Sequence, residues 1–162
     1  MPLIIDGHNL LWAVQKPFGS GEGDESISDV QLCCIIGRYL KLTGESGEII
    51  FDGTGPIDKS QFDNITNLQV LFVGRATDAD SVIEQKIEVS SAPRRLTVVS
   101  SDRRLRNAAR ARKATAVKSE VFWNDVAKQL SRKKAAKEPP EKRLGLTESE
   151  TKLWLEFFGI EQ

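Results

Sequence analysis

Close to the N-terminus the chain reads Leu3-Ile4-Ile5-Asp6-Gly7-His8-Asn9, a short apolar run that ends in an aspartate and a glycine. A continuous apolar run of this length, counted from residue 2 to residue 5, predicts a fully buried strand. Further strand-like runs follow at 48–51, 69–73, 95–99 and, more briefly, 114–117. Because helical patterns separate these runs, we expect an α/β fold with a parallel central sheet flanked by helices.

The expected helices follow from apolar spacing and from capping residues. One should be capped by Ser26 or Ser28 and reach Leu40. Others are expected from about 78 to 89, in the arginine-rich stretch after Asp102, and from about 120 to 136.

Four aspartates stand at or just after the end of such a run, or at the start of the helix that follows it: Asp6, Asp52, Asp80 and Asp102. The carboxyl ends of parallel strands open onto one crevice, so we expect these side chains to lie together. Two carboxylates ~6 Å apart repel by about 3 kcal/mol at an effective dielectric near 20, and Mg²⁺ or Mn²⁺ would relieve that repulsion. One aspartate alone is more often a turn residue or a helix cap than part of a functional site. Four favour a site in which all of them bind metal and take part in catalysis, with Glu84 as a candidate fifth ligand.

Polar residues beside these aspartates are candidates for substrate contacts. Asn9 could orient Asp6 or a metal-bound water, or it could fix the turn after the first strand. Ser101 could donate to a phosphate or to Asp102, with helix capping as the alternative. A structural or loop role explains His8, the single histidine, at least as well as substrate contact does. Because one histidine cannot be acid and base at once, we expect attack by a metal-activated water that leaves a 5′-phosphate and a 3′-hydroxyl.

The net charge of zero hides a segregation of charge along the chain. Residues 94–143 contain 16 Lys/Arg and 5 Asp/Glu, whereas the remainder contains 7 and 18. A metal-dependent enzyme that acts on a polyanion needs such an arrangement. Arg75, Arg103 and Arg104 are candidate phosphate contacts, because a guanidinium group matches phosphate geometry. For residues 103–112, simple solvation of an exposed helix carries equal weight.

Composition predicts one compact domain over residues 1–136. Residues 137–162 are expected to form a charged, proline-containing linker and a short amphipathic helix. No apolar run approaches the ~20 residues that a membrane span requires, so no membrane partner is expected. The adjacent cysteines Cys33 and Cys34 suit neither a disulfide framework nor a zinc site, which favours a reducing cytoplasm.

Four motifs carry a resemblance to a known family. They are Leu3-Ile4-Ile5-Asp6-Gly7-His8-Asn9, Ile50-Phe51-Asp52-Gly53, Ala79-Asp80-Ser81-Val82-Ile83-Glu84 and Val98-Val99-Ser100-Ser101-Asp102. In this order and spacing, over residues 2 to about 124, the chain resembles the NYN domains of the YacP type, which are PIN-like ribonucleases. His8 departs from the tyrosine that such domains often have, and the turn at 53–56 is a second departure.

The resemblance implies a PIN-like three-layer sandwich, dependence on Mg²⁺ or Mn²⁺, and endonucleolytic cleavage of RNA. Asp6, Asp52, Asp80 and Asp102 match the acidic positions of the family, and Asn9 matches the polar one. The chain is therefore predicted to be a metal-dependent endoribonuclease with RNA as its partner, and the ribosome is a second candidate partner. The alternative is a non-catalytic RNA- or ribosome-binding module whose acidic cluster holds only a structural cation. Retention of every acidic position favours catalysis.

Overall fold

The computed structural model describes residues 2–15 and 27–137, with side chains as far as residue 133. The chain divides into two compact units, Met1–Trp123 and Asn124–Gln162, and each is treated by itself. The first unit contains the whole sheet and every residue predicted to belong to the site. The linker and amphipathic helix predicted for 137–162 lie outside the described residues, and the domain boundary at 136 stays a prediction.

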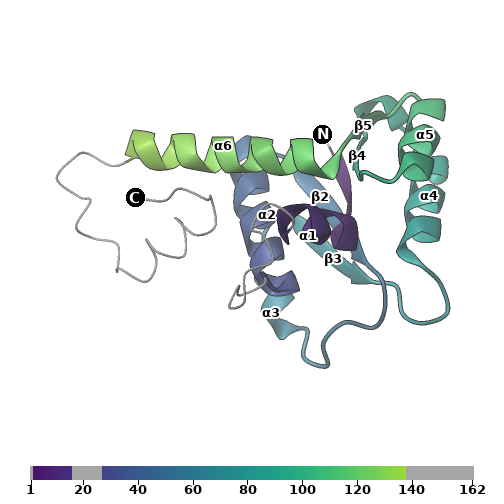
Figure 1. Ribbon diagram of the computed structural model, residues 1–162, viewed down its shortest axis with the longest axis horizontal. Coiled ribbons are helices and arrows are strands. Elements are labelled where there is room, and N and C mark those ends of the chain that lie inside the picture. The colour runs from purple at the N-terminus through teal and green to yellow at the C-terminus, as the bar shows by residue number, and fades with distance from the viewer. Residues whose placement is uncertain (1, 16–26, 138–162) are drawn as a thin grey trace. The chain divides into compact units, whose positions relative to one another are not determined.

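A parallel sheet forms the centre of the first unit, as the sequence predicts (Figure 1). Within the described residues its strands lie in the order β3-β2-β1-β4-β5. Their bounds are β1 (Pro2–Asp6), β2 (Ser46–Phe51), β3 (Leu68–Phe72), β4 (Thr97–Val99) and β5 (Thr115–Val117). The register pairs Ile5 of β1 with Ile49 on one side and with Val99 on the other. Asp6, the last residue of β1, therefore lies at the middle of the carboxyl edge of the sheet.

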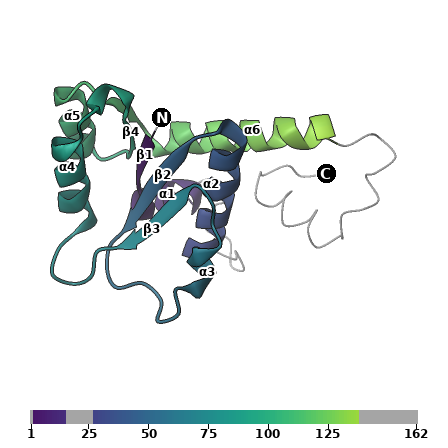
Figure 2. The same ribbon diagram turned by 180° about the vertical axis from the view of Figure 1, so that it is seen from behind.

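Helices cover both faces of the sheet, which gives the three-layer sandwich (Figure 2). One layer contains α1 (Gly7–Gln15) and α2 (Asp29–Thr43), which pack on β1, β2 and β3. The other contains α4 (Ala79–Val89) and α5 (Arg103–Ala111), whose apolar residues form a core with Ile4, Ile50 and Val98. Alternate residues of a strand point to opposite faces, so each buried strand supplies both layers.

Capping residues define both ends of α2, and its start agrees with the sequence prediction. Ser28 caps the helix: its Oγ accepts from the Gln31 N–H at 3.2 Å, and the Gln31 Oε1 accepts from the Ser28 N–H at 2.9 Å. The helix ends at Gly44, which has a φ of 71° that favours glycine. A short helix, α3 (Ser60–Asp63), follows β2 and was not predicted.

Helix α1 is a second element that the sequence analysis did not predict. The chain passes from β1 directly into α1, with Gly7 as its first residue. A Cβ atom on Gly7 would lie 2.5 Å from the Phe51 ring, so only glycine allows the chain to turn this close to β2. Asp-Gly is typical of a turn, but here it begins a helix that buries Leu10, Ala13 and Val14.

Helix α6 (Ser119–Lys137) matches the last predicted helix, which was placed at about 120–136. It begins in the first unit and continues into the second. Within the part of the chain that the structure describes, no helix is both long and apolar enough to cross a membrane.

Candidate active site

The order of the strands reverses direction between β1 and β4, the two strands at the centre of the candidate site. The chain builds β1, β2 and β3 toward one side, and α4 then leads it back to β4 and β5 on the other side. Such a reversal between neighbouring strands is the usual ligand-binding position in open parallel sheets. Ser100, directly after β4, donates its hydroxyl hydrogen to Asp6 Oδ2 at 3.1 Å. The two strand ends are thus joined by a buried hydrogen bond.

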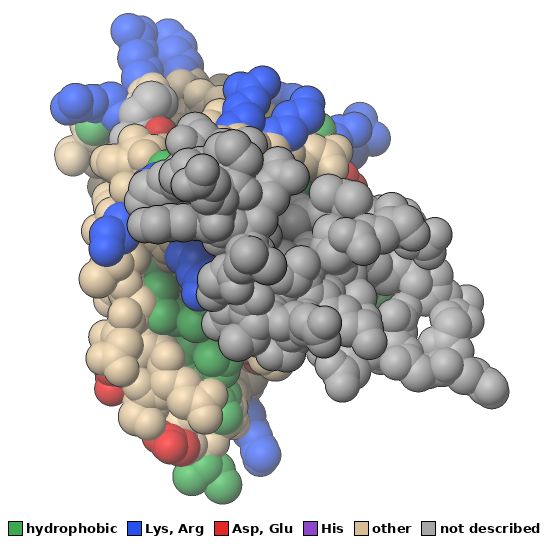
Figure 3. Space-filling view, turned by 90° about the vertical axis from the view of Figure 1, so that its left-hand side faces the viewer, with side chains coloured by type: hydrophobic (Ala, Val, Ile, Leu, Met, Phe, Trp, Pro, Cys, Tyr) green, Lys and Arg blue, Asp and Glu red, His purple; other side chains and the backbone are tan. Residues whose placement is uncertain are grey.

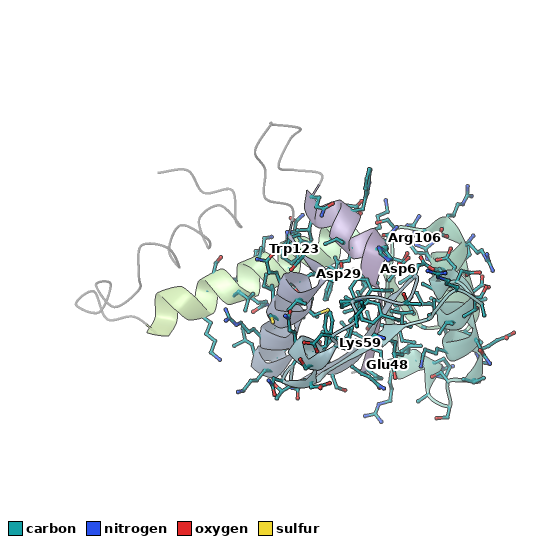
Figure 4. The ribbon with its side chains drawn as sticks, turned by 90° about the horizontal axis from the view of Figure 1, so that it is seen from below. Asp6, Asp29, Glu48, Lys59, Arg106 and Trp123 are labelled. Atoms are coloured by element: carbon teal, nitrogen blue, oxygen red, sulfur yellow. The ribbon has the colours of Figure 1, made fainter. Side chains whose placement is uncertain are left out.

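Asp6 is a buried carboxylate, with 6% of its surface exposed (Figure 4). Its Oδ1 accepts from the Asn9 N–H at 3.4 Å, in the first turn of α1. Burial raises the pKa of Asp6 from its ordinary value of 3.8 to about 6, against the lowering effect of its hydrogen bonds from Asn9 and Ser100. The negative charges of Asp80 and Asp52 raise it further. Near neutral pH the group is a carboxylate that a cation would stabilise.

Asp52 directly follows β2, and its side chain contacts the first residue of α4. Its Oδ1 accepts from the Ala79 N–H at 2.7 Å, across 27 positions of sequence. An isolated bridge between Gly53 and Gly74 fixes the two loops that lead there, with the Gly74 N–H donating to the Gly53 carbonyl at 2.8 Å. Both glycines have a φ near 80°, which other residues rarely adopt.

Asp80 and Asp102 lie in the first turn of α4 and at the start of α5. Asp102 caps α5, because its Oδ1 accepts from the N–H groups of Arg104 at 2.7 Å and Leu105 at 3.3 Å. Asp80 accepts no hydrogen bond from the residues that the structure describes, since Asp78 is the residue that caps α4. Burial raises the pKa of Asp80, and the charges of Asp102, Asp52 and Asp78 add to this rise.

The charges of Asp80 and Asp52 thus act on Asp6, and those of Asp102 and Asp52 act on Asp80, so the structure brings the four predicted aspartates into one region. They are not drawn tightly together: in the described ranges no three His, Cys, Asp or Glu side chains form a group that holds a metal as it stands. Within those ranges Asp52 Oδ2 and Asp102 Oδ2 accept no hydrogen bond. These two oxygens and the Asp80 carboxylate are the acceptors left for a cation or for water.

Asn9 is held in one orientation by two donors. Its Oδ1 accepts from the Ser101 N–H at 2.8 Å and from the Ser119 hydroxyl at 2.6 Å. The amide NH₂ is thereby left as a pair of donors beside Asp6. Sequence reasoning missed Ser119, which is completely buried, because its partner lies 110 positions away.

Ser101 is engaged within the protein. Its hydroxyl donates to Glu120 Oε2 at 2.5 Å and accepts from the Ser119 N–H at 3.1 Å. The predicted contact of its hydroxyl with phosphate therefore requires these bonds to open. Its backbone N–H holds Asn9, which is a positioning role.

The three predicted arginines differ in their surroundings. Arg75, in the loop after β3, and Arg103, the first residue of α5, are exposed. Arg104 forms two charge-assisted hydrogen bonds with Glu84 of α4, both at 2.6 Å. Its guanidinium is thus paired with the residue predicted as a fifth metal ligand. A part of its surface stays open, since the side chain is 59% exposed.

Arg106 is a further arginine that the sequence analysis did not single out (Figure 4). It lies on α5 one turn after Asp102, and its Nε is buried without a hydrogen-bond partner in the described part of the chain. On the face in Figure 3, Lys and Arg side chains stand along the upper rim, and few Asp and Glu side chains are visible. Arg103, Arg104 and Arg110 of α5 are exposed, so this helix presents guanidinium groups to solvent.

His8 lies beside the site and contacts Asp52 and Phe51. Its Nε2 is 3.4 Å from the Asp52 carbonyl oxygen, and its ring meets Phe51 edge to face with centroids 5.4 Å apart. These contacts match the structural role that the sequence allowed.

Comparison with known proteins agrees with this arrangement. A parallel sheet between helical layers, with aspartates at the carboxyl edge beside the strand reversal, defines the PIN-like nuclease fold. The family model of the YacP-like NYN domain matches residues 3–154. The chain therefore belongs to the YacP-like NYN domain family, as its motifs indicate. The match continues past residue 136, beyond the span over which the motifs were recognised.

Solved structures of similar fold exist. A crystal structure of Rae1 (YacP) from Bacillus subtilis shares 20% identity, with a TM-score of 0.68 over 95% of this chain and 92% of that chain. A W164L mutant of the same protein gives a TM-score of 0.62, also at 20% identity, over 98% and 92%. At this identity the likeness establishes the fold alone. No curated protein matches the chain.

Proposed function

We propose that this protein is a metal-dependent endoribonuclease that hydrolyses phosphodiester bonds in RNA. The observation that carries the proposal is the set of four aspartates at one edge of the sheet, two of which have raised pKa values. Membership of a family with a PIN-like nuclease fold supports it. The arginines of α5 supply a positive surface on which a polyanion can bind.

The chemistry of the carboxylates fits Mg²⁺ or Mn²⁺. Hard oxygen ligands suit both ions, and Mg²⁺ is often held by one or two carboxylates while it keeps several waters. Such a site does not require a closed group of three protein ligands. Asp80, with the free oxygens of Asp52 and Asp102, would hold the ion, and Asp6 would lie behind them. When bound, the ion supplies an activated water and neutralises charge on the phosphate.

The chain's own residues would position the substrate. The Asn9 NH₂ group is aimed by Ser101 and Ser119, and it can donate to a phosphate oxygen or to a water beside Asp6. Arg75 and Arg103 are exposed and can follow the phosphate chain. Because the chain has a single histidine and it contacts Phe51, the route through the RNA 2′-hydroxyl lacks a placed acid and base.

The direct test is cleavage of an end-labelled RNA with Mg²⁺ or Mn²⁺, compared with EDTA. Asp80→Asn is the sharpest variant, because Asp80 has no described hydrogen bond to lose. Asp63→Asn on α3 removes an equal charge from an exposed position outside the site and is the matched control. We expect metal-dependent cleavage by the wild type and the control only, with 5′-phosphate and 3′-hydroxyl ends. Cleavage that survives EDTA, or 2′,3′-cyclic phosphate products, would contradict the proposal.

A non-catalytic RNA-binding module is the second candidate function. One observation favours it: Asp6, Asp52 and Asp102 each accept a backbone N–H at the start of a helix, so each has a structural role. In that case RNA binds, but no metal produces cleavage and Asp80→Asn changes nothing. The predicted ribosome contact and the cytoplasmic location stay predictions.

A further inference from the structure

A tryptophan on α1 is exposed to solvent beside the candidate active site. Four large hydrophobic side chains are exposed in the described part of the chain, and Trp12, at 69%, is the aromatic one among them. The other three are aliphatic residues: Ile57, Val89 and Val121. An exposed tryptophan has few structural reasons to stay, because burial of its ring would stabilise the fold.

The position of Trp12 ties it to the site rather than to the remainder of the surface. It follows His8 by four residues and Asn9 by three, so the three side chains share one face of α1. Long side chains on a helix lean toward its N-terminus, which directs the Trp12 ring toward the first turn of α1. That turn donates to Asp6 through the Asn9 N–H, so it joins the helix that carries Trp12 to the acidic cluster.

We propose that Trp12 is a stacking platform for one base of single-stranded RNA. The inference rests on the proposed function and names the substrate class of the same site. Helix α1 begins directly after Asp6 and rises by about 8 Å from Gly7 to Trp12. A base within about three nucleotides of a phosphate at the carboxylates can reach across that distance. Every base has a face that stacks on an aromatic ring, so the contact tolerates many sequences.

This arrangement selects single strands. Bases in an A-form duplex are stacked on one another and cannot turn toward a tryptophan, whereas unpaired bases can. The phosphates would meet the arginines of α5 and the Asn9 amide while a base lies on Trp12. Trp12 is thus a substrate-positioning residue, and it is not part of the chemistry.

The test is equilibrium binding of a fluorescent single-stranded RNA and of a matched hairpin to the full chain. The Asp80→Asn background and EDTA keep the RNA intact. Trp12→Ala should bind the single strand about tenfold more weakly, and Trp12→Phe, which keeps a ring, about threefold more weakly. Val89→Ala is the matched control, because Val89 is equally exposed but ends α4 at the opposite edge of the sheet. Hairpin binding should not change in any of these variants.

Two readouts separate this inference from the proposed function. In the first, cleavage is measured with Mn²⁺ in a protein that keeps Asp80, where Trp12→Ala should raise KM for the single strand while kcat changes little. In the second, RNA should quench the tryptophan fluorescence of Trp12→Phe less than that of the wild type. Single-strand binding by Trp12→Ala equal to wild type, or an equal loss for the hairpin, would overturn the inference even if cleavage is normal. If no metal supports cleavage but the binding pattern holds, the stacking role stands and the catalytic proposal fails.

Discussion

The carboxyl and amino edges of the same sheet differ in how their charges are matched. At the carboxyl edge, burial and the charges of neighbouring aspartates raise the pKa of Asp6 and of Asp80, and Asp80 accepts no hydrogen bond from the described residues. At the amino edge, an open groove of about 740 Å³ is lined by neutral residues and by the Lys86–Glu48 ion pair, with 2.8 Å between Nζ and Oε2. Helix α4 spans both, with Asp80 at one end and Lys86 near the other. Charge is therefore paired at the amino edge and unpaired at the carboxyl edge, where we propose that a cation binds.

The largest expected effect is on cleavage. Asp102→Asn should reduce metal-dependent RNA cleavage by about 100-fold or more, because loss of a metal ligand removes several kcal/mol of transition-state stabilisation. Asparagine caps helices as well as aspartate does, so α5 should stay intact. Glu48→Gln at the amino edge should cleave within about twofold of wild type. Equal losses in the two variants, measured as kcat/KM, would remove the distinction between the edges.

The next effect is on stability and follows from the Asp6 pKa. A carboxyl whose pKa is raised by folding binds more protons in the native than in the unfolded state between about pH 4 and pH 6. Stability therefore falls as pH rises through that window, and the loss is complete above about pH 6. In metal-free buffer Asp6→Asn should raise the free energy of unfolding at pH 8 by up to about 3 kcal/mol, and by little at pH 4.

Urea unfolding at the two pH values measures this difference. Glu48→Gln is the comparison variant, and it should lower stability by no more than about 1 kcal/mol, because exposed ion pairs contribute little. An Asp6→Asn protein that is less stable than wild type at pH 8 would show that Asp6 serves the fold rather than the site.

The fold could be predicted to a large extent because its signals are local. Short apolar runs in the sequence predict the strands, and the capping pair Ser28 and Gln31 indicates the start of α2. Helix α1 was missed because its first residue is Gly7, a poor helix former whose presence is explained only by the Phe51 ring above it. That contact joins residues 44 positions apart and leaves no mark in the local sequence.

Some features of the candidate site could likewise be predicted from the sequence, and others could not. Convergence of the aspartates follows from their placement after parallel strands, which the sequence reveals. The role of Ser119 in orienting Asn9 and the pairing of Arg104 with Glu84 do not follow, because the first depends on how the start of α6 meets α1 and the second on how α4 packs against α5. Arginine content predicts a positive surface, but it does not say which guanidinium is already paired.

The smallest expected effect is a difference between two ion pairs of α4, Arg104–Glu84 and Lys86–Glu48. Arg104→Ala and Lys86→Ala should each change stability only slightly, because exposed ion pairs contribute little. Only Arg104→Ala should weaken RNA binding, by a few-fold. It should also reduce the slope of log affinity against log salt concentration by about 0.7, which is the value for one phosphate contact on a single strand. A salt series for each variant measures this slope, and an unchanged slope in Arg104→Ala would confine Arg104 to its contact with Glu84.

Binding of Mn²⁺ to the full chain, measured by titration calorimetry at pH 8, tests most directly whether the carboxyl edge is a metal site. The wild type and Asp63→Asn should bind Mn²⁺ with equal affinity, while Asp80→Asn should bind at least about tenfold more weakly. Lowering the pH toward 5 should weaken binding to the wild type, because protons then compete for Asp6 and Asp80, whose pKa values are raised. Equal Mn²⁺ affinity in the wild type and Asp80→Asn would contradict the metal-site proposal and leave Asp6, Asp52 and Asp102 with their backbone hydrogen bonds at helix starts alone.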